Sequence, residues 1–427
     1  MRVLMFGWEY PPAISGGLGT ACHGISTGLV ARGTDLVFIL PRLDGREPDE
    51  GVYLRSASGT PVSQELKKAV AAAHSHVGDR LNLRPVPSRL TPYGSQGFTN
   101  PLKLPAAGTS GEISHLHGGY HDDLMEEIYR YADAASAIAV EEHRRRPADL
   151  IHAHDWMTFP AAIAASEVTG LPFVAHLHAT EFDRCGEHGY DKIYAIEKNG
   201  LQAADHVIAV SERTRQMAIT RYGVNPDKIS VVYNGVSPLA HKPISSVPPL
   251  MQEEKRVLFM GRITWQKGPG FFVDAARLVL DQMPDVRFIM AGSGDLLKAM
   301  IERAAALRIG SRFHFTGFLR GEEIQHMYAI SSLYVMPSVS EPFGITPLEA
   351  LQCGIPILLS RQCGCAEVLP GARSMDYWDV RGMAGHILEL LGNPGEAARS
   401  LALCQEELKA LTWERAVDGI LNAYEHV

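Results

Sequence analysis

Short runs of aliphatic residues alternate along the first half of the chain with segments of amphipathic, helical spacing. We expect strands at Val3–Phe6, Leu36–Leu40, Leu150–His152, Phe173–His176 and His206–Val210. We expect helices near Thr20–Arg32, Asp123–Arg144, Phe159–Val168 and Glu212–Tyr222. This alternation is typical of a parallel sheet covered by helices.

The same pattern starts again after a proline- and serine-rich stretch, Pro243–Pro249. Its predicted strands are Arg256–Met260, Val286–Ala291, Arg312–Phe315, Leu333–Met336 and Ile355–Leu359. Its predicted helices are Gly270–Gln282, Asp295–Ala305, Glu322–Ile330, Pro347–Cys353 and Met383–Leu391. The pattern predicts an α/β chain with two Rossmann-like, doubly wound domains.

We place the first domain at residues 1–240 and the second at 250–412. Residues from about 43 to 120 are rich in Gly, Pro and Ser and predict an irregular elaboration of the first domain. The last segment, 413–427, has helical spacing and is expected to cross back to the first domain.

Composition narrows the class of protein. The chain has 427 residues, of which 46% are hydrophobic and 21% charged, with a formal net charge of -8. That charge lacks the basic footprint of a general nucleic-acid binder. No apolar run approaches the roughly 20 residues of a membrane span, and the start of the chain does not resemble a signal peptide. We therefore expect a cytoplasmic protein, and composition leaves its oligomeric state open.

Two glycine-rich turns weigh against a dinucleotide site. Gly16-Gly17-Leu18-Gly19 follows the first strand, but Cys22 stands where the G-x-G-x-x-G pattern needs Gly or Ala. Gly292-Ser293-Gly294 is followed by Asp295, which places a carboxylate at a position meant for pyrophosphate. We therefore do not favour a dinucleotide-dependent oxidoreductase as the function of this chain.

Residues that could bind a ligand or take part in catalysis follow two predicted strands of the second domain. Arg262 and Lys267 lie on a strand-to-helix loop, where open α/β sheets bind ligands. In most proteins, however, two such cations are exposed surface residues that bind no ligand. After a second strand comes Ser340–Glu349, in which Pro347 suits a first helical turn. Backbone N–H groups from Gly344 to Thr346 and the helix dipole can accept a diphosphate.

These motifs together resemble the donor site of retaining GT-B glycosyltransferases, the large family with two glutamates separated by seven residues that is related to glycogen and starch synthases. The residues that carry the resemblance are Gly261-Arg262, Lys267-Gly268, Glu341-Pro342-Phe343-Gly344 and Glu349-Ala350. Further support comes from His152-Ala153-His154-Asp155-Trp156, Val210-Ser211-Glu212, Asn234-Gly235-Val236 and the opening from Pro11 to Gly19. The resemblance implies two domains that face each other across a cleft.

The resemblance also implies roles. Arg262 and Lys267 would stabilise the leaving nucleoside diphosphate, which fits the lack of a D-x-D-like motif and implies no obligatory metal or other cofactor. Glu349 would bind the ribose, and Thr346 would lie near the distal phosphate. Glu341 and the backbone of Phe343, Gly344 and Ile345 would bind the sugar, while Gly17 lets a loop approach the phosphates.

On the first domain, the resemblance places His178 against the donor sugar, although a lone histidine is more often packed or solvated. Asp155 would lie near the acceptor and sugar, and Glu181 and Arg184 are weaker candidates for acceptor contacts. We expect His152 to cap or pack a strand.

The implied activity is transfer of a hexosyl, in particular a glucosyl, group with retention of configuration to a glycan or other hydroxyl acceptor. Ile14-Ser15-Gly16-Gly17 lacks the lysine that glycogen and starch synthases carry there, which puts ADP-glucose and a long glucan in doubt. UDP, ADP and GDP are not separated by sequence, and we favour UDP or ADP. A nucleotide-sugar epimerase and a non-catalytic glycan- or nucleotide-sugar-binding protein remain alternatives.

Overall fold

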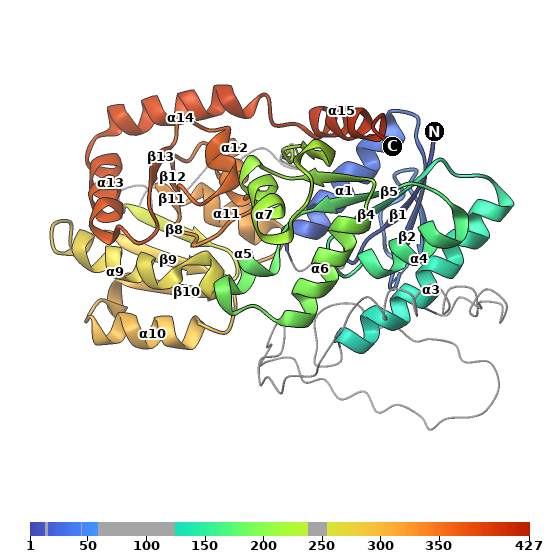
Figure 1. Cartoon of the computed structure of the whole chain (residues 1–427). Coiled ribbons are helices and arrows are strands. Elements are labelled where there is room, and N and C mark those ends of the chain that lie inside the picture. The colour runs from blue at the N-terminus through green and yellow to red at the C-terminus, as the bar shows by residue number, and fades with distance from the viewer. Residues whose placement is uncertain (13–15, 44, 59–123, 238–253) are drawn as a thin grey trace.

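The computed structural model describes residues 1–12, 16–43, 45–58, 124–237 and 254–427. These residues form two α/β units that lie side by side, each built on one wholly parallel sheet (Figure 1). The predicted linker Pro243–Pro249 lies outside the described residues, as does most of the predicted elaboration at 43–120. The predicted fold class, two facing Rossmann-like domains, is confirmed.

The first sheet has the strand order β3-β2-β1-β4-β5-β6-β7. Its strands are β1 (Arg2–Phe6), β2 (Asp35–Leu40), β3 (Tyr53–Ser56), β4 (Leu150–His154), β5 (Phe173–Leu177), β6 (His206–Ala209) and β7 (Ile229–Val231). Every residue of β1, β4, β5 and β6 is buried because helices cover both faces of the sheet.

Alternate residues of these strands face two different helix layers. One face packs against α3 (Leu124–Arg145) and α4 (Phe159–Thr169). The other face packs against α1 (Gly17–Ala31) and α15 (Trp413–Tyr424). Among the described residues, the remaining α-helices of this unit are α5 (Glu181–Cys185), α6 (Asp191–Ala203) and α7 (Glu212–Tyr222).

The second sheet has the strand order β10-β9-β8-β11-β12-β13. Its strands are β8 (Arg256–Met260), β9 (Arg287–Ala291), β10 (Phe313–Gly317), β11 (Leu333–Met336), β12 (Ile357–Ser360) and β13 (Arg373–Met375). Its helices are α9 (Pro269–Leu280), α10 (Leu297–Ala306), α11 (Glu322–Ala329), α12 (Thr346–Gln352), α13 (Val380–Gly392) and α14 (Pro394–Leu408).

Helix α15 follows the second unit in sequence but packs on the first, beside α1 (Figure 1). A Cβ on Gly24 would lie 2.3 Å from the Trp413 ring, and one on Gly28 would lie 2.6 Å from the Val417 side chain. The two glycines therefore let the helices approach closely. A helix over Trp413–Tyr424 was predicted and is confirmed.

Several elements were not predicted. Strand β3 is a partly exposed edge of four residues, two of them polar, and β7 and β13 each have three residues. Such short edge strands leave no aliphatic run for a pattern to detect. Helices α6 and α14 were also not predicted. Among the described helices, none has both the length and the apolar content needed to cross a bilayer.

Candidate active site

The loop after β8 carries the two predicted cations. Arg262 is exposed, and its Nη2 donates to Gln266 Oε1 over 3.2 Å. A short 3-10 helix, η3 (Trp265–Lys267), ends at Gly268, whose φ is +65°. A Cβ there would lie 2.1 Å from the Pro337 carbonyl oxygen, so only glycine lets this loop lie against the segment that follows β11.

That contact brings Lys267 to Glu341. The Lys267 ammonium donates to a Glu341 carboxylate oxygen, and both side chains are mostly buried. The Gln266 carbonyl accepts from the Val339 N–H over 2.9 Å, which ties the two loops together. The structure therefore joins residues 74 positions apart at the carboxyl edge of the second sheet, as the sequence predicted.

The turn after Glu341 leads into α12. Gly344 has a φ of +99°, which favours glycine, and Phe343 is buried. The Thr346 hydroxyl bonds the Tyr334 hydroxyl over 2.8 Å. Because α12 has only seven residues, we assign most of the positive potential at this edge to Arg262 and Lys267 rather than to the helix dipole.

Glu349 lies one turn into α12 and points to Tyr328. The Tyr328 hydroxyl donates to Glu349 Oε2 over 3.0 Å and is also 3.2 Å from the Thr346 carbonyl oxygen. Burial raises the pKa of the Glu349 carboxyl above its ordinary value, and the hydrogen bond from Tyr328 opposes that rise. This carboxylate is held in place through Oε2 and lines a cavity between the two units.

Residues of both units meet around a cavity of about 220 Å³ beside Glu349. It is lined by Thr20 of α1 on one side and by Tyr328, Ile345, Glu349 and Gln352 on the other. Gly17, the first residue of α1, faces the same turn, since a Cβ on it would lie 3.9 Å from Ile345 Cδ1. The structure thus places Gly17 near the predicted donor residues.

Asp155 and His178 lie at the carboxyl ends of β4 and β5. Asp155 has a φ of +59°, and its Oδ1 accepts from the His178 N–H over 2.6 Å and from the Ala179 N–H over 3.3 Å. Burial raises the pKa of the Asp155 carboxyl to about 7, against the lowering effects of Arg184 and these two bonds. Asp155 therefore fixes the backbone that carries His178.

The His178 imidazole is nearly buried, and its Nε2 lies 2.9 Å from His154 Nδ1. Burial lowers the pKa of His178 to about 3, so the ring is neutral near pH 7. A neutral imidazole can donate one hydrogen bond and accept another. His152 is fully buried on β4, consistent with the packing role expected for it.

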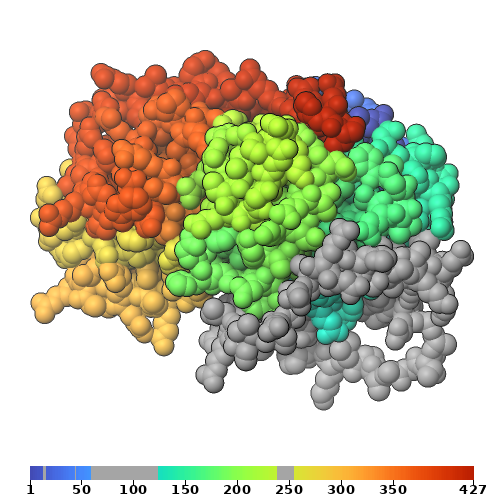
Figure 2. All heavy atoms as spheres, viewed as in Figure 1, coloured from blue at the N-terminus to red at the C-terminus, as the bar shows by residue number. Residues whose placement is uncertain are grey.

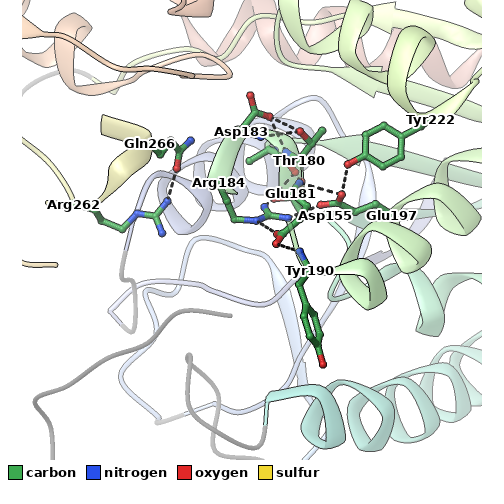
Figure 3. A network of polar contacts seen from close by, with 11 residues as sticks. Asp155, Thr180, Glu181, Asp183, Arg184, Tyr190, Glu197, Tyr222, Arg262 and Gln266 are labelled. Atoms are coloured by element: carbon green, nitrogen blue, oxygen red, sulfur yellow. Dashed lines mark hydrogen bonds and ion pairs between the residues drawn. The ribbon is translucent and has the colours of Figure 1, made fainter. Parts of the chain in front are cut away.

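Glu181 and Arg184 belong to a buried network in α5 and α6 (Figure 3). Arg184 Nε donates to Glu181 Oε2 over 3.0 Å, and its Nη2 pairs with Glu197. Tyr222 donates its hydroxyl to Glu197, and Glu181 Oε1 accepts from the Tyr190 N–H over 2.8 Å. These bonds organise the segment after His178, and acceptor contacts by Glu181 and Arg184 stay predictions.

The sequence did not reveal the residues that join the two units next to Glu341. Ser340 Oγ bonds Asp183 Oδ1 and also accepts from Arg213 Nη2 over 2.9 Å. The Ser211 hydroxyl donates to the Pro342 carbonyl over 2.6 Å. In the space-filling view, the green part of the first unit lies directly against the orange part of the second (Figure 2).

A carboxylate of the second unit caps a helix of the first. The backbone N–H groups of Glu212 and Arg213, at the start of α7, each donate to a Glu367 oxygen over 2.8 Å. Negative charge at a helix N-terminus is favourable. Ser211, Glu212 and Pro342 belong to motifs of the resemblance, but neither the motifs nor the spacing indicated that these residues, with Glu367, join the two units.

A parallel sheet on each side of a cleft, with paired cations and carboxylates at one sheet edge, defines a two-domain α/β protein with a ligand site between its domains. Two family models match: "Glycosyltransferase Family 4" over residues 110–238 and "Glycosyl transferases group 1" over residues 242–399. The chain belongs to the GT-B glycosyltransferases.

Relatives support this assignment along the whole chain. An uncharacterized glycosyltransferase of Methanocaldococcus jannaschii is 27% identical over 86% of this chain and 83% of its own length. A glycogen synthase of Mycobacterium tuberculosis is 25% identical over 99% of this chain and 94% of its own length. The fold is also similar to that of Anabaena HepE in complex with UDP-glucose, with a TM-score of 0.69, 17% identity and full coverage of both chains.

Proposed function

We propose that this chain is a retaining glycosyltransferase that moves a hexosyl group, in particular a glucosyl group, from a nucleoside diphosphate sugar to a glycan or other hydroxyl acceptor. The observation that carries the proposal is the junction of two loops at one sheet edge. There Lys267 meets Glu341, and Arg262 lies on the same loop with a neutral partner.

Each part of a sugar donor has a matching group in this arrangement. Glu349, oriented by Tyr328, suits the ribose hydroxyls at the cavity between the units. Glu341, the turn from Phe343 to Ile345 and neutral His178 suit the sugar hydroxyls. Gly17 and Thr346 lie where the phosphates would pass between these two ends.

The chemistry that we propose depends on charge rather than on a protein nucleophile. As the glycosidic bond to the diphosphate breaks, negative charge grows on the leaving group, and Arg262 and Lys267 stabilise it. The acceptor hydroxyl attacks from the face that the diphosphate leaves and passes its proton to the departing phosphate. Two cations then serve where other transferases use a metal ion, so we propose that transfer needs no metal.

We propose UDP-glucose as the first donor to test and ADP-glucose as the second. HepE, with a similar fold, is described in complex with UDP-glucose, and a full-length relative is a glycogen synthase. We expect the enzyme to act in the cytoplasm.

The test has two stages. UDP, ADP and GDP are first compared for their effect on the thermal unfolding midpoint, and we expect one of them to raise it. The corresponding glucose donor is then incubated with glucan and small sugar acceptors, and proton NMR of the product reads its anomeric configuration. Retention supports the proposal, whereas inversion contradicts the mechanism.

The same assay addresses the alternatives. Isomerised nucleotide sugar formed without any acceptor would indicate an epimerase. Stabilisation by a nucleotide with neither transfer nor donor hydrolysis across the acceptor panel would indicate a binding protein. Either result would overturn the proposed transfer reaction.

A further inference from the structure

Four histidines lie side by side on one face of the first sheet, and the proposed transfer reaction uses only one of them. His152 and His154 are two residues apart on β4, and His176 and His178 occupy equivalent positions at the end of β5. In the parallel register His154 pairs with His176. Because side chains alternate along a strand, all four imidazoles point to the same face.

Three of these rings are closed off from solvent. His152 and His154 are 0% exposed and His176 is 1% exposed. One ring nitrogen from each lies within 4.8 Å of the others. Burial lowers the pKa of all three rings, so they are neutral and keep a lone pair available for a ligand.

Two of the ring nitrogens in this cluster have no partner. Among the described residues, no group bonds the buried Nε2 of His154 or of His176. A buried polar atom left without a partner destabilises the folded state. Two such atoms on facing residues of neighbouring strands are explained if a ligand binds them.

We propose that His152, His154 and His176 form a binding site for one divalent transition-metal ion such as Zn²⁺, each binding through Nε2. This site is separate from the donor site. Imidazole is a preferred ligand for such ions, and three histidines with a water molecule as the fourth ligand form a known kind of zinc site.

The positions of the rings suit an ion of this size. With a Zn–N distance of about 2.0–2.1 Å and tetrahedral angles, the centroids of three bound imidazoles lie roughly 5 Å apart. Here the centroid separations are 4.5 Å for His152–His154, 5.2 Å for His152–His176 and 5.2 Å for His154–His176. The rings stack at interplanar angles of 29°, 20° and 31°, so they must turn about χ2 before their Nε2 atoms aim at one point, and this torsion is broad for histidine.

The outer partners of the rings fit as well. Metal-bound histidines commonly donate their other ring N–H to a second group, which fixes their orientation. His152 Nδ1 lies 2.5 Å from the Tyr424 hydroxyl of α15, and His154 Nδ1 lies 2.9 Å from His178 Nε2. Besides the turn about χ2, binding requires His152 Nε2 to release its 3.1 Å bond to His176 Nδ1, which leaves His176 Nδ1 without that partner.

This site would link the ion to the docking of the C-terminal helix, because Tyr424 comes from α15. It would also fix the partner of His178 on the side away from the cleft. Since the rings are buried, we expect the ion to enter while the chain folds and to exchange slowly afterwards.

The test is to express the full chain in minimal medium with Zn²⁺, with Co²⁺ or without either ion, and to desalt it thoroughly. We expect about one ion per chain by elemental mass spectrometry and a higher thermal midpoint for the loaded protein. A His154→Gln, His176→Gln double variant should lose the ion. The control is His206→Gln, a buried histidine on β6 that bonds Ser230 and lies outside the cluster.

Wild-type protein loaded with Co²⁺ gives a readout that needs no variant. Visible d–d bands of a four- or five-coordinate ion and an X-ray absorption spectrum with imidazole scattering would support the site. An oxygen-only first shell, an ion retained by the double variant, or no ion above the background of unloaded protein would each overturn it.

Discussion

Each wall of the cleft contains one arginine, and the two arginines differ in their surroundings. Arg262 of the second unit is exposed and bonds the neutral side chain of Gln266. Arg184 of the first unit is mostly buried between the carboxylates of Glu181 and Glu197. The charge of Arg184 is balanced within the fold, whereas the charge of Arg262 is available to an anion that enters the cleft.

The comparison suggests that the two walls of the cleft have different roles. In the proposed mechanism, Arg262 meets the leaving group from an exposed loop that backbone contacts hold, whereas Lys267 of the same loop is paired with Glu341. The first unit would orient the sugar, and there the charged side chains of Arg184, Glu181 and Glu197 hold one another and the segment after His178. Four substitutions test this difference.

The largest expected effect is on stability, at the buried wall. Arg184→Ala removes the shared partner of Glu181 and Glu197 and leaves their charges buried. Breaking such a pair costs about 3–5 kcal/mol. Urea unfolding should show this loss, while Arg145→Ala, which removes an exposed pair with Glu141, should change the free energy of unfolding by at most about 1 kcal/mol. If Arg184→Ala lowered the free energy of unfolding by a similarly small amount, the proposed difference between the two walls would be wrong.

The next effect is on turnover, at the exposed wall. Arg262→Ala should lower kcat by roughly 10²–10³, because one charge-stabilising donor is worth about 3–4 kcal/mol in the transition state. The thermal midpoint should stay close to that of the wild type, since the side chain is exposed. Lys298→Ala, at an exposed lysine of α10, is the matched control and should retain wild-type kcat.

A smaller effect is expected on donor affinity. Glu349→Gln keeps the shape of the side chain but removes the charge that would bind ribose hydroxyls, and hydrogen bonds to charged groups are worth about 1.5–3 kcal/mol. Calorimetry should show nucleoside diphosphate binding weakened by roughly tenfold or more. Tyr328→Phe, which removes the bond that orients Glu349, should weaken it less. Unchanged binding in Glu349→Gln would mean that the ribose lies elsewhere.

The smallest effect concerns the backbone that carries His178. Asp155→Ala loses the acceptor for two backbone N–H groups and puts alanine at a φ of +59°, but it also removes a buried carboxyl whose desolvation opposes folding, so the net loss of stability should be about 1–2 kcal/mol. Asp155→Asn keeps an acceptor oxygen and a residue that tolerates this conformation. Its free energy of unfolding should therefore lie between those of the wild type and Asp155→Ala, and equal values for all three proteins would contradict the positioning role.

Much of the fold was predictable because the buried strands are runs of aliphatic residues, which are easy to detect in a sequence. The expected strand Arg256–Met260 and the expected helix Glu212–Tyr222 coincide with β8 and α7. Edge strands such as β7 were missed because three residues carry no period. Spacing placed Arg262, Lys267 and Glu341 on loops after parallel strands, and the common edge of a parallel sheet brings such loops together.

Other features of the site depend on contacts that a one-dimensional pattern does not contain. The bond between Ser340 and Asp183 joins residues 157 positions apart. Burial of Glu181 and Arg184 depends on Glu197 and Tyr222, which come from later helices. The four-histidine array needed the register of β4 and β5, although the two H-x-H patterns are visible in the sequence.

The most direct test of the account is a crystal structure of the chain with the nucleoside diphosphate that stabilises it most. We predict the β-phosphate within hydrogen-bond distance, about 2.7–3.0 Å, of the Arg262 guanidinium and the Lys267 ammonium, with the ribose on Glu349. A diphosphate bound away from these three side chains, or an Arg262 that remains turned to solvent in the complex, would contradict it.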